Sequence, residues 1–166
     1  SFGLQIAGEE GLLILYTSGT TGRSKGALIS HRAVIARTMV HAAELGAPKN
    51  DTFIAWTPLC HMGAIDPSIA TLLNGGKVII IDGFDPEQIV YFLKREKTHW
   101  LVLVPGMIDR FMDAVRGERE NIKGVNMIGV MADLVPRHQI AEVTDLMQAP
   151  YFNSFGSTET GNPPAS

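Results

Sequence analysis

Residues 12–26 read LLILYTSGTTGRSKG, a short apolar run that passes directly into a loop of glycines and hydroxyl side chains. The run LLILY has the length and the β-branched and aromatic content of a buried strand. The loop that follows, Thr17–Gly26, is a poor core element, because it gives up apolar burial for small polar residues. We therefore expect a strand that delivers a ligand-binding loop at its end.

The composition of this loop suits a polyphosphate. Its three glycines allow backbone N–H groups to approach an anion closely, its hydroxyls add donors, and Lys25 supplies a positive charge. The loop is not the P-loop of common NTPases, because two residues separate Gly22 from Lys25, and it contains no G-x-G-x-x-G. The alternative, a flexible connector, is disfavoured by the position of the loop between a strand and Ser30–His31.

The bulk composition excludes several classes of protein. The chain has 166 residues, which suffices for one domain. A net charge of −3 gives no electrostatic footprint for nucleic acid, and no apolar run approaches the ~20 residues of a membrane span. The single cysteine, Cys60, excludes an internal disulfide and a multi-thiolate metal site. The N-terminus lacks the layout of a signal peptide, so the expected compartment is a reducing cytoplasm.

After residue 28 the sequence alternates between helical periodicity and short β-branched runs. The pattern predicts a helix over 31–45, with Ser30 as its N-cap and Gly46 as its stop, and a helix after Asp85 as N-cap. The predicted strands are 12–16, 52–56, 77–81, 99–104, 126–131 and 151–155, and the other predicted helices are 61–73, 86–97, 106–115 and 136–147. This order predicts an α/β fold, a three-layer α/β/α open, mainly parallel sheet. Ligands of such sheets bind beyond the carboxyl ends of the strands.

The segment YTSGTTGRSKGALISHRAV, residues 16–34, resembles the phosphate-binding signature of the adenylate-forming (AMP-binding) superfamily. This superfamily comprises acyl- and aryl-CoA synthetases, peptide-synthetase adenylation domains and luciferases. The resemblance implies that the loop holds the β- and γ-phosphates of ATP while a carboxylate attacks the α-phosphorus, with Lys25 among the catalytic residues. The implied phosphate-contacting residues are Thr17, Ser18, Gly19, Thr20, Thr21, Gly22 and Lys25.

A second segment, NSFGSTETG at residues 153–161, resembles the tyrosine-glycine-x-threonine-glutamate signature of the same family. Taken alone, it is also compatible with a turn leading into a capped helix. The resemblance implies that Phe155, in place of the usual tyrosine, packs on adenine, that Thr158 contacts the α-phosphate, and that Glu159 binds Mg²⁺. It also implies nucleotide contacts from Asn153 and Gly156. Magnesium prefers oxygen ligands and often combines one carboxylate with phosphate oxygens, which agrees with the role of Glu159.

The segment PLCHMGA at residues 58–64 resembles the carboxylate-site motif of the acyl/aryl-CoA synthetase branch. The resemblance implies that His61 borders the acyl pocket, and Met62, Gly63 and Ala64 as pocket walls suggest an aliphatic or aryl acid. Cys60 is expected to be a packing residue. Peptide-synthetase domains carry phenylalanine-aspartate-x-serine here, and residues 65–68, IDPS, are superficially similar. The spacing from Gly75 and Gly76 favours the CoA-ligase form, with Asp66 as a local resemblance.

A fourth segment, GVMADLVP at residues 129–136, stands where the family has a glycine/alanine-rich turn that lines the acyl pocket and the adenine site. Met131 and Asp133 occupy positions where small residues are common. Either they narrow or polarise the pocket, or Asp133 caps the helix that Pro136 opens. We favour the cap.

The resemblance runs from Leu12 to Gly161 and implies that residues 1–166 form a single partial AMP-binding domain. The preceding N-terminal region, the ribose-binding aspartate, the hinge and the small C-terminal domain with its lysine are expected outside this chain. The implied function is that of a fragment of an AMP-forming acyl-CoA synthetase. The full-length enzyme is then expected to use ATP, Mg²⁺ and a carboxylic acid to form an acyl-adenylate, and to transfer the acyl group to CoA. The chain alone is then expected to be inactive. Two alternatives are a stand-alone nucleotide-binding module and a piece of a peptide-synthetase adenylation domain.

Overall fold

The computed structural model of the chain describes residues 7–17, 24–46, 48–154 and 156–161. Its first element is a β-hairpin of strands β1 (Gly11–Thr17) and β2 (Lys25–Ser30), which pair antiparallel with Leu15 opposite Ala27 and Thr17 opposite Lys25. Pairing of Thr17 with Lys25 brings together the two ends of the predicted phosphate loop. The side chain of Leu15 is buried, while Leu12, Ile14 and Tyr16 on the alternate positions are exposed.

The second sheet has four parallel strands in the order β4-β3-β5-β6. Its members are β3 (Thr52–Ala55), β4 (Lys77–Ile80), β5 (Thr98–Leu101) and β6 (Val125–Ile128). The chain passes from β3 outward to β4, then returns over β3 to β5 and continues to β6. The direction of strand addition therefore reverses between β3 and β5, and the carboxyl ends of these two strands form the switch point of the sheet.

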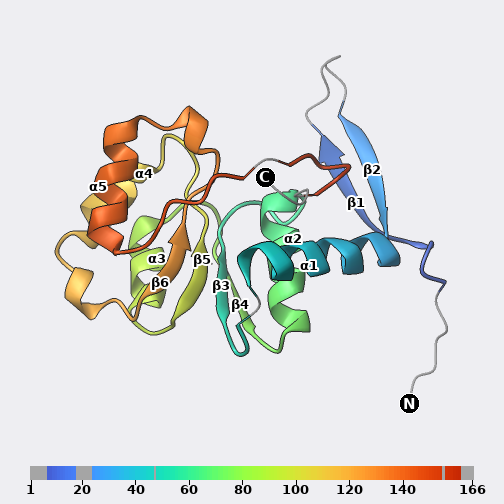
Figure 1. Cartoon of the computed structure of the whole chain (residues 1–166), viewed down its shortest axis with the longest axis horizontal. Coiled ribbons are helices and arrows are strands. Elements are labelled where there is room, and N and C mark those ends of the chain that lie inside the picture. Colours follow the sequence, from blue (N-terminus) through green and yellow to red (C-terminus); the bar gives the residue numbers. More distant parts are fainter. Residues whose placement is uncertain (1–6, 18–23, 47, 155, 162–166) are drawn as a thin grey trace.

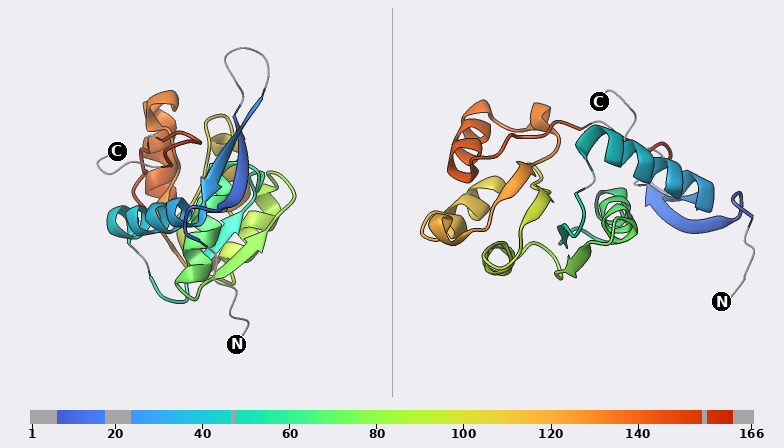
Figure 2. Two further views of the ribbon diagram at one scale, coloured as in Figure 1. Left: turned by 90° about the vertical axis from the view of Figure 1, so that its right-hand side faces the viewer. Right: turned by 60° about the horizontal axis from the view of Figure 1, so that its bottom comes forward.

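The helices cover both faces of this sheet, as Figures 1 and 2 show. Because parallel crossovers are right-handed, the reversal of direction puts α2 on one face and α3 and α4 on the other. Helix α1 packs beside α2, and α5 packs beside α4. The helices are α1 (His31–Leu45), α2 (Met62–Leu73), α3 (Pro86–Leu93), α4 (Ile108–Val115) and α5 (Arg137–Met147). The predicted three-layer α/β/α fold is thus confirmed.

Local signals set the helix boundaries. The hydroxyl of Ser30 accepts a hydrogen bond from the Ala33 N–H (3.2 Å), and a carboxylate oxygen of Asp85 accepts one from the Gln88 N–H (2.9 Å). Both predicted N-caps are confirmed. Helix α1 ends at Gly46, whose φ of +83° lies in the left-handed region that glycine tolerates.

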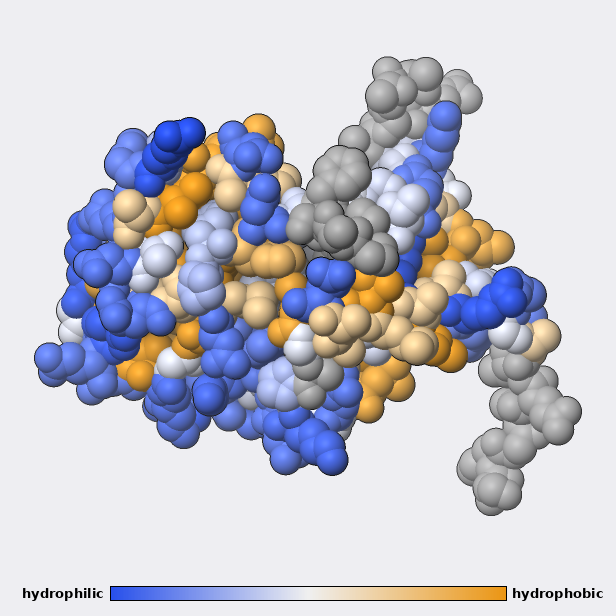
Figure 3. All heavy atoms as spheres, viewed as in Figure 1, coloured by the Kyte–Doolittle hydropathy of each residue, from blue (hydrophilic) through white to orange (hydrophobic). Residues whose placement is uncertain are grey.

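The main core fills the space between the sheet and its helices. It includes the side chains of Ile54, Leu101 and Ile128 from the strands, with Ile89 and Phe111 from the covering helices. A smaller cluster of Leu15, Ile29 and Val34 attaches the hairpin to α1. Figure 3 shows further apolar surface beside the base of the hairpin. In the hairpin itself, the side chains of Ile14 and Leu28 are exposed.

Several elements differ from the sequence-based expectation. Strand β2 was not predicted, because residues 24–26 read as part of the loop. Helix α3 ends at Leu93 instead of residue 97. Of the expected strand 151–155, residues 151–154 are described, and among them only Tyr151 forms a β-bridge, with Ile128. Two short 3-10 turns, η1 (Arg119–Asn121) and η2 (Ala132–Leu134), flank β6. In the described part of the chain, no helix has the length and apolar character needed to cross a bilayer.

Candidate functional site

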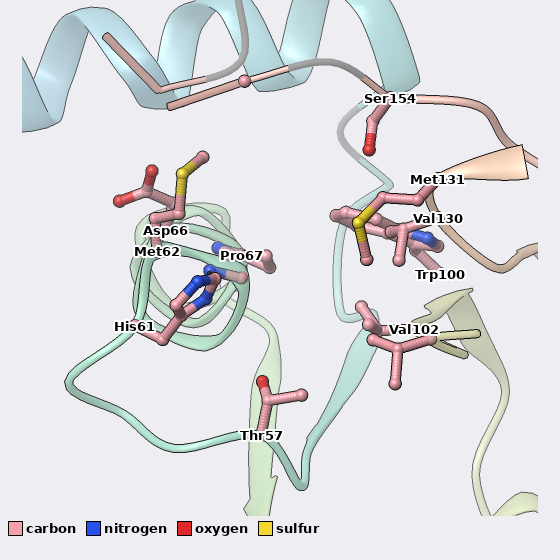
Figure 4. Close-up of a pocket in the computed structure, with 13 residues that line it drawn as sticks. Thr57, His61, Met62, Asp66, Pro67, Trp100, Val102, Val130, Met131 and Ser154 are labelled. Carbon is pink, nitrogen blue, oxygen red and sulfur yellow. Dashed lines mark hydrogen bonds between the residues drawn. The ribbon is translucent and has the colours of Figure 1, made fainter. Parts of the chain in front are cut away.

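The carboxyl ends of β3 and β5 open into an apolar pocket of about 180 Å³, which lies at the switch point of the sheet. The sequence-based expectation that a ligand site lies at this edge therefore has a matching cavity. Figure 4 shows that residues from α2 face residues from β5 and the segment after β6 across the pocket. Its lining comprises Thr57, His61, Met62, Gly63, Asp66, Pro67, Trp100, Val102, Val104, Val130, Met131, Ser154 and Gly156.

His61 stands at the mouth of this pocket as the N-cap of α2. Its Nδ1 accepts a hydrogen bond from the Gly63 N–H (3.0 Å). Because Nδ1 is an acceptor, the neutral imidazole carries its proton on Nε2. Met62 and Gly63 line the pocket as predicted, but Ala64 is fully buried and lies outside the lining, so this part of the wall prediction is wrong. Cys60, expected to be a packing residue, is exposed.

Hydrogen bonds fix the wall of the pocket that lies opposite α2. The indole N–H of Trp100 donates to the Gly129 carbonyl (2.9 Å), and the Trp100 ring meets the Phe152 ring edge-on. The hydroxyl of Tyr151 donates to the carbonyls of Leu103 (3.3 Å) and Val130 (3.1 Å). Burial raises the pKa of this hydroxyl above its ordinary value. These bonds tie the ends of β5 and β6 to the segment that leads to residue 156.

A second, larger cavity of about 700 Å³ adjoins the pocket, with His61, Met62, Met131 and Gly156 common to both. It brings together the two ends of the predicted phosphate loop, the N-terminus of α2 and the glutamate signature, by which we mean the segment 153–161 that contains Glu159. Its lining comprises Tyr16, Thr17, Lys25, His61, Met62, Met131, Gly156, Ser157, Thr158 and Glu159. Thr17, Lys25, His61, Gly156, Thr158 and Glu159, which come from three distant motifs, therefore share one cavity.

Other predicted site residues are not placed there. Asn153 is exposed, and its side chain accepts a hydrogen bond from the Ala132 N–H (3.0 Å), so it supports η2. The predicted contacts of Ser18, Gly19, Thr20, Thr21 and Gly22, and the adenine contact of Phe155, lie outside the described residues.

The residues after β6 behave differently from the favoured prediction. Helix α5 has Pro136 as its N-cap and no side-chain cap hydrogen bond, so the prediction that Asp133 caps it is wrong. Asp133 instead belongs to η2, where its carboxylate accepts a bond from Asn153 Nδ2 (3.4 Å). Met131 has a φ of +51° and lines both cavities. The alternative that Met131 narrows the pocket therefore fits its position.

Two charged residues that the sequence analysis did not assign to the site lie at its edge, and one of them, Asp66, is part of the lining of the apolar pocket. The guanidinium of Arg37 in α1 bonds to the carboxylate of Asp66 in α2 (3.1 Å), and it donates to the Thr158 carbonyl (2.7 Å). Burial raises the pKa of the Asp66 carboxyl, against the opposing effect of the Arg37 charge. A sequence signal existed, because Arg37 occupies the same helical stripe as the buried residues Val34 and Leu45.

The donor set of the larger cavity fits a magnesium nucleotide. Glu159 offers an exposed carboxylate on the cavity wall, Lys25 offers an ammonium group, and Thr17 and Thr158 offer hydroxyls. Magnesium is usually bound through one or two carboxylates together with substrate phosphates, and an ammonium group serves as a point charge for phosphate. The cavity therefore has the chemistry needed for both the cation and the phosphates.

Known proteins are similar in sequence to this chain. Indoleacetate–CoA ligase of Aromatoleum aromaticum (strain DSM 19018 / LMG 30748 / EbN1) is 31% identical over 159 residues, covering 94% of this chain and 31% of the ligase. The beauvericin nonribosomal cyclodepsipeptide synthetase of Beauveria bassiana is 27% identical over 157 residues, covering 89% of this chain and 5% of the synthetase. The chain thus spans less than a third of the length of these relatives.

The comparison with solved structures also finds a similar protein. The crystal structure of ATP-bound MatB from Rhodopseudomonas palustris superposes with a TM-score of 0.78 at 26% identity, covering 96% of this chain and 31% of that chain. The sequence model of the AMP-binding enzyme family matches residues 5–163. Because this match runs over almost its whole length, the chain belongs to the AMP-binding enzyme family.

Proposed function

We propose that this chain is part of a longer AMP-forming acid–thiol ligase of the acyl-CoA synthetase type. The observation that carries the proposal is the single cavity lined by Lys25, His61, Thr158 and Glu159, which adjoins an apolar pocket. The larger cavity binds Mg-ATP and the pocket binds the hydrocarbon part of a carboxylic acid. The carboxylate group then lies at the boundary between them, where His61 and Met131 line both spaces.

The proposed roles combine the family resemblance with the positions of those residues that the structure describes. Lys25 at the start of β2 and Thr17 opposite it hold phosphate oxygens at the ends of the loop, together with Ser18, Gly19, Thr20, Thr21 and Gly22. Glu159 holds Mg²⁺, which when bound offsets the negative charge that develops on the phosphates. Thr158 contacts the α-phosphate, and Phe155 and Gly156 border the nucleoside.

The apolar pocket supports an aliphatic or aryl acid. Most of its wall consists of valine, methionine, proline and tryptophan side chains, and its volume of about 180 Å³ suits a compact acyl group. The carboxylate of Asp66 points toward α1, away from the pocket centre (Figure 4), and is already paired with Arg37. A paired carboxylate is a weak partner for a substrate ammonium group, which favours a CoA ligase over amino-acid activation by a peptide synthetase.

The acceptor in this proposal is CoA. The 31% identity to an indoleacetate–CoA ligase supports a CoA ligase more strongly than the 27% identity to a cyclodepsipeptide synthetase supports a carrier-protein acceptor. The hinge and the lysine domain required for the second half-reaction lie outside residues 1–166 in this proposal. The chain alone is therefore expected to bind nucleotide without turnover.

Carboxylate-dependent ATP–pyrophosphate exchange in the full-length protein tests the first half-reaction. A panel of aliphatic, aryl and amino acids should give exchange with aliphatic or aryl members, AMP as product, and a thioester once CoA is added. Exchange with amino acids alone would favour the peptide-synthetase alternative. If Mg-ATP binds but no acid supports exchange, the protein is a nucleotide-binding module and the ligase proposal is wrong.

A further inference from the structure

Arg37 is a charged residue at an interior position of α1. Its side chain is only 8% exposed, and that of its partner Asp66 is 14% exposed. A buried charge is costly unless it is paired and hydrogen-bonded, so its partners indicate why it is kept there. These partners connect α1, α2 and the glutamate signature.

The guanidinium makes contacts on two sides. One nitrogen bonds to both carboxylate oxygens of Asp66 (3.1 and 3.5 Å), and the other donates to the Thr158 carbonyl (2.7 Å). The stem of Arg37 packs under Gly161, where an added Cβ would lie 3.0 Å from Arg37 Cγ. Arg37 therefore contacts both ends of residues 158–161.

Residues 157–161, which Arg37 contacts, form a turn that is held by hydrogen bonds between its own residues. The Gly161 N–H donates to the Ser157 carbonyl (2.8 Å), the Ser157 N–H donates to the Gly161 carbonyl (3.2 Å), and the Thr160 N–H donates to the Ser157 hydroxyl (3.2 Å). These bonds fix the shape of the turn but not its orientation against the rest of the protein. The bond from Arg37 supplies that orientation.

The Thr158 carbonyl and the Glu159 N–H belong to one planar peptide unit. When a charged donor fixes the carbonyl, it also fixes the position of the Glu159 Cα, from which the side chain extends. A charge-assisted hydrogen bond is well suited to this, because it is shorter and stronger than a neutral one. The carboxylate of Glu159 then faces the cavity that it lines.

Asp66 has a complementary effect on the same guanidinium. Arg37 bonds to the Thr158 carbonyl, which directly precedes Glu159. Without a partner of its own, the guanidinium would be attracted to the nearby carboxylate of Glu159. By binding the opposite side of the guanidinium, Asp66 holds it on the Thr158 carbonyl and offsets its charge. Glu159 is thereby left available for a cation.

We propose that Arg37 and Asp66 form a positioning pair that orients the Thr158–Glu159 peptide, so that Glu159 presents its carboxylate to the metal of the bound nucleotide. In this role the pair acts through the Thr158–Glu159 peptide, although Asp66 also lies in the lining of the apolar pocket. It links the helix that begins after His61 with the turn that carries Glu159, and so aligns the acid side and the metal side of the site. This inference rests on the proposed function, because it assumes that Glu159 binds Mg²⁺.

Calorimetric titration of the full-length protein with Mg-ATP, and separately with ATP in EDTA, tests the pair. Arg37→Met removes the donors but keeps most of the stem. It should weaken Mg-ATP binding by about 10- to 100-fold, as is typical for residues that orient a metal ligand, and should change metal-free ATP binding much less. Asp66→Asn should act in the same direction, and Arg37→Lys, which keeps one donor for the carbonyl, should recover part of the loss.

Arg32→Met is the matched control, since Arg32 lies on the same helix with an exposed partner, Glu9. It should leave both titrations unchanged. Equal losses of Mg-ATP and metal-free ATP binding in folded Arg37→Met would overturn the pair, as would unchanged binding. If Arg37→Met does not fold, the same readouts on Asp66→Asn decide. Selective loss of Mg-ATP binding, without exchange for any acid, would support the pair and contradict only the ligase proposal.

Discussion

The ring of Tyr151 lies directly over the backbone of Gly129, so that a Cβ on this glycine would stand 2.1 Å from Tyr151 Cζ. Gly129 also has a φ of +81°. Its carbonyl accepts the indole hydrogen bond of Trp100, a pocket residue. This contact therefore joins the end of β6 to the wall of the apolar pocket, and only glycine fits there.

Replacement of Gly129 by alanine should destabilise the protein. Strain at positive φ and overlap with the Tyr151 ring together are expected to cost about 2–4 kcal/mol. Denaturant unfolding measures the loss. Gly117→Ala is the control, because a Cβ there meets nothing within 4 Å, and it should change stability by less than about 0.5 kcal/mol. Equal stability of the two variants would contradict this account of the contact.

His41 in α1 should make stability depend on pH. Burial, and secondly the charge of His99, lower the pKa of His41 from 6.5 to about 4. The unfolded chain therefore takes up a proton at a higher pH than the folded one. Stability is full above pH 6.5 and falls as the pH drops toward 4, by roughly 3 kcal/mol at most.

Unfolding temperatures of the wild type and His41→Phe between pH 7.5 and pH 4 test this, since phenylalanine keeps a ring against Trp100. The variant should lose less stability than the wild type over this interval. His138→Phe, at an exposed position of α5, should follow the wild-type curve. Parallel curves for His41→Phe and the wild type would exclude His41 as the source.

The charge of the Asp85 carboxylate should stabilise the N-terminus of α3. Its bonds to the Gln88 backbone N–H and side chain lower the pKa of its carboxyl. Because the folded pKa is the lower one, this stabilisation is present at neutral pH and is lost as the pH falls through the folded pKa. Asp85→Asn should lower the unfolding temperature near pH 7 and cause a smaller difference in acid. The exposed Asp82, changed to asparagine, is the control, and a difference that persists undiminished in acid would contradict a charge effect.

Met131 should limit the size of the acid, if the proposed function holds. It lines both cavities from a left-handed backbone position. Met131→Ala removes most of the side chain and should shift the ratio of kcat/KM toward bulkier acids by about tenfold, as expected for small changes of volume in a hydrophobic pocket. Leu134→Ala, at an exposed position of the same turn, should leave the ratio unchanged. An unchanged ratio in Met131→Ala would show that other residues set the size limit.

Local chemistry made most of the fold predictable. Ser30 and Asp85 begin their helices because their side chains satisfy free backbone N–H groups, and this depends on only three residues of sequence. The alternation of helices and apolar strands likewise predicted parallel pairing. Strand β2 was not predicted, because it is formed by pairing with β1 and because Lys25 at its start is equally typical of the end of a loop.

Short motifs predicted residues that the structure brings into one cavity, namely Thr17 and Lys25 at the ends of the loop and the Thr158–Glu159 pair. Prediction failed where the environment of a side chain is set by segments that are distant in sequence. Asp133 looked like a helix cap but binds Asn153, and Ala64 looked like a pocket wall but is buried. Side-chain direction depends on packing against distant segments, which residue type and spacing do not specify.

The sequence by itself determined the family, the layered α/β fold and the candidate residues of the nucleotide site, because each is encoded in short stretches whose physics is local. Only the tertiary structure decided that the switch point of the sheet forms the apolar pocket, that Gly129 lies beneath Tyr151, and that Arg37 holds Thr158 across 121 positions of sequence. These relationships arise from right-handed crossovers and close packing, which bring together residues that carry no mark of one another in the chain.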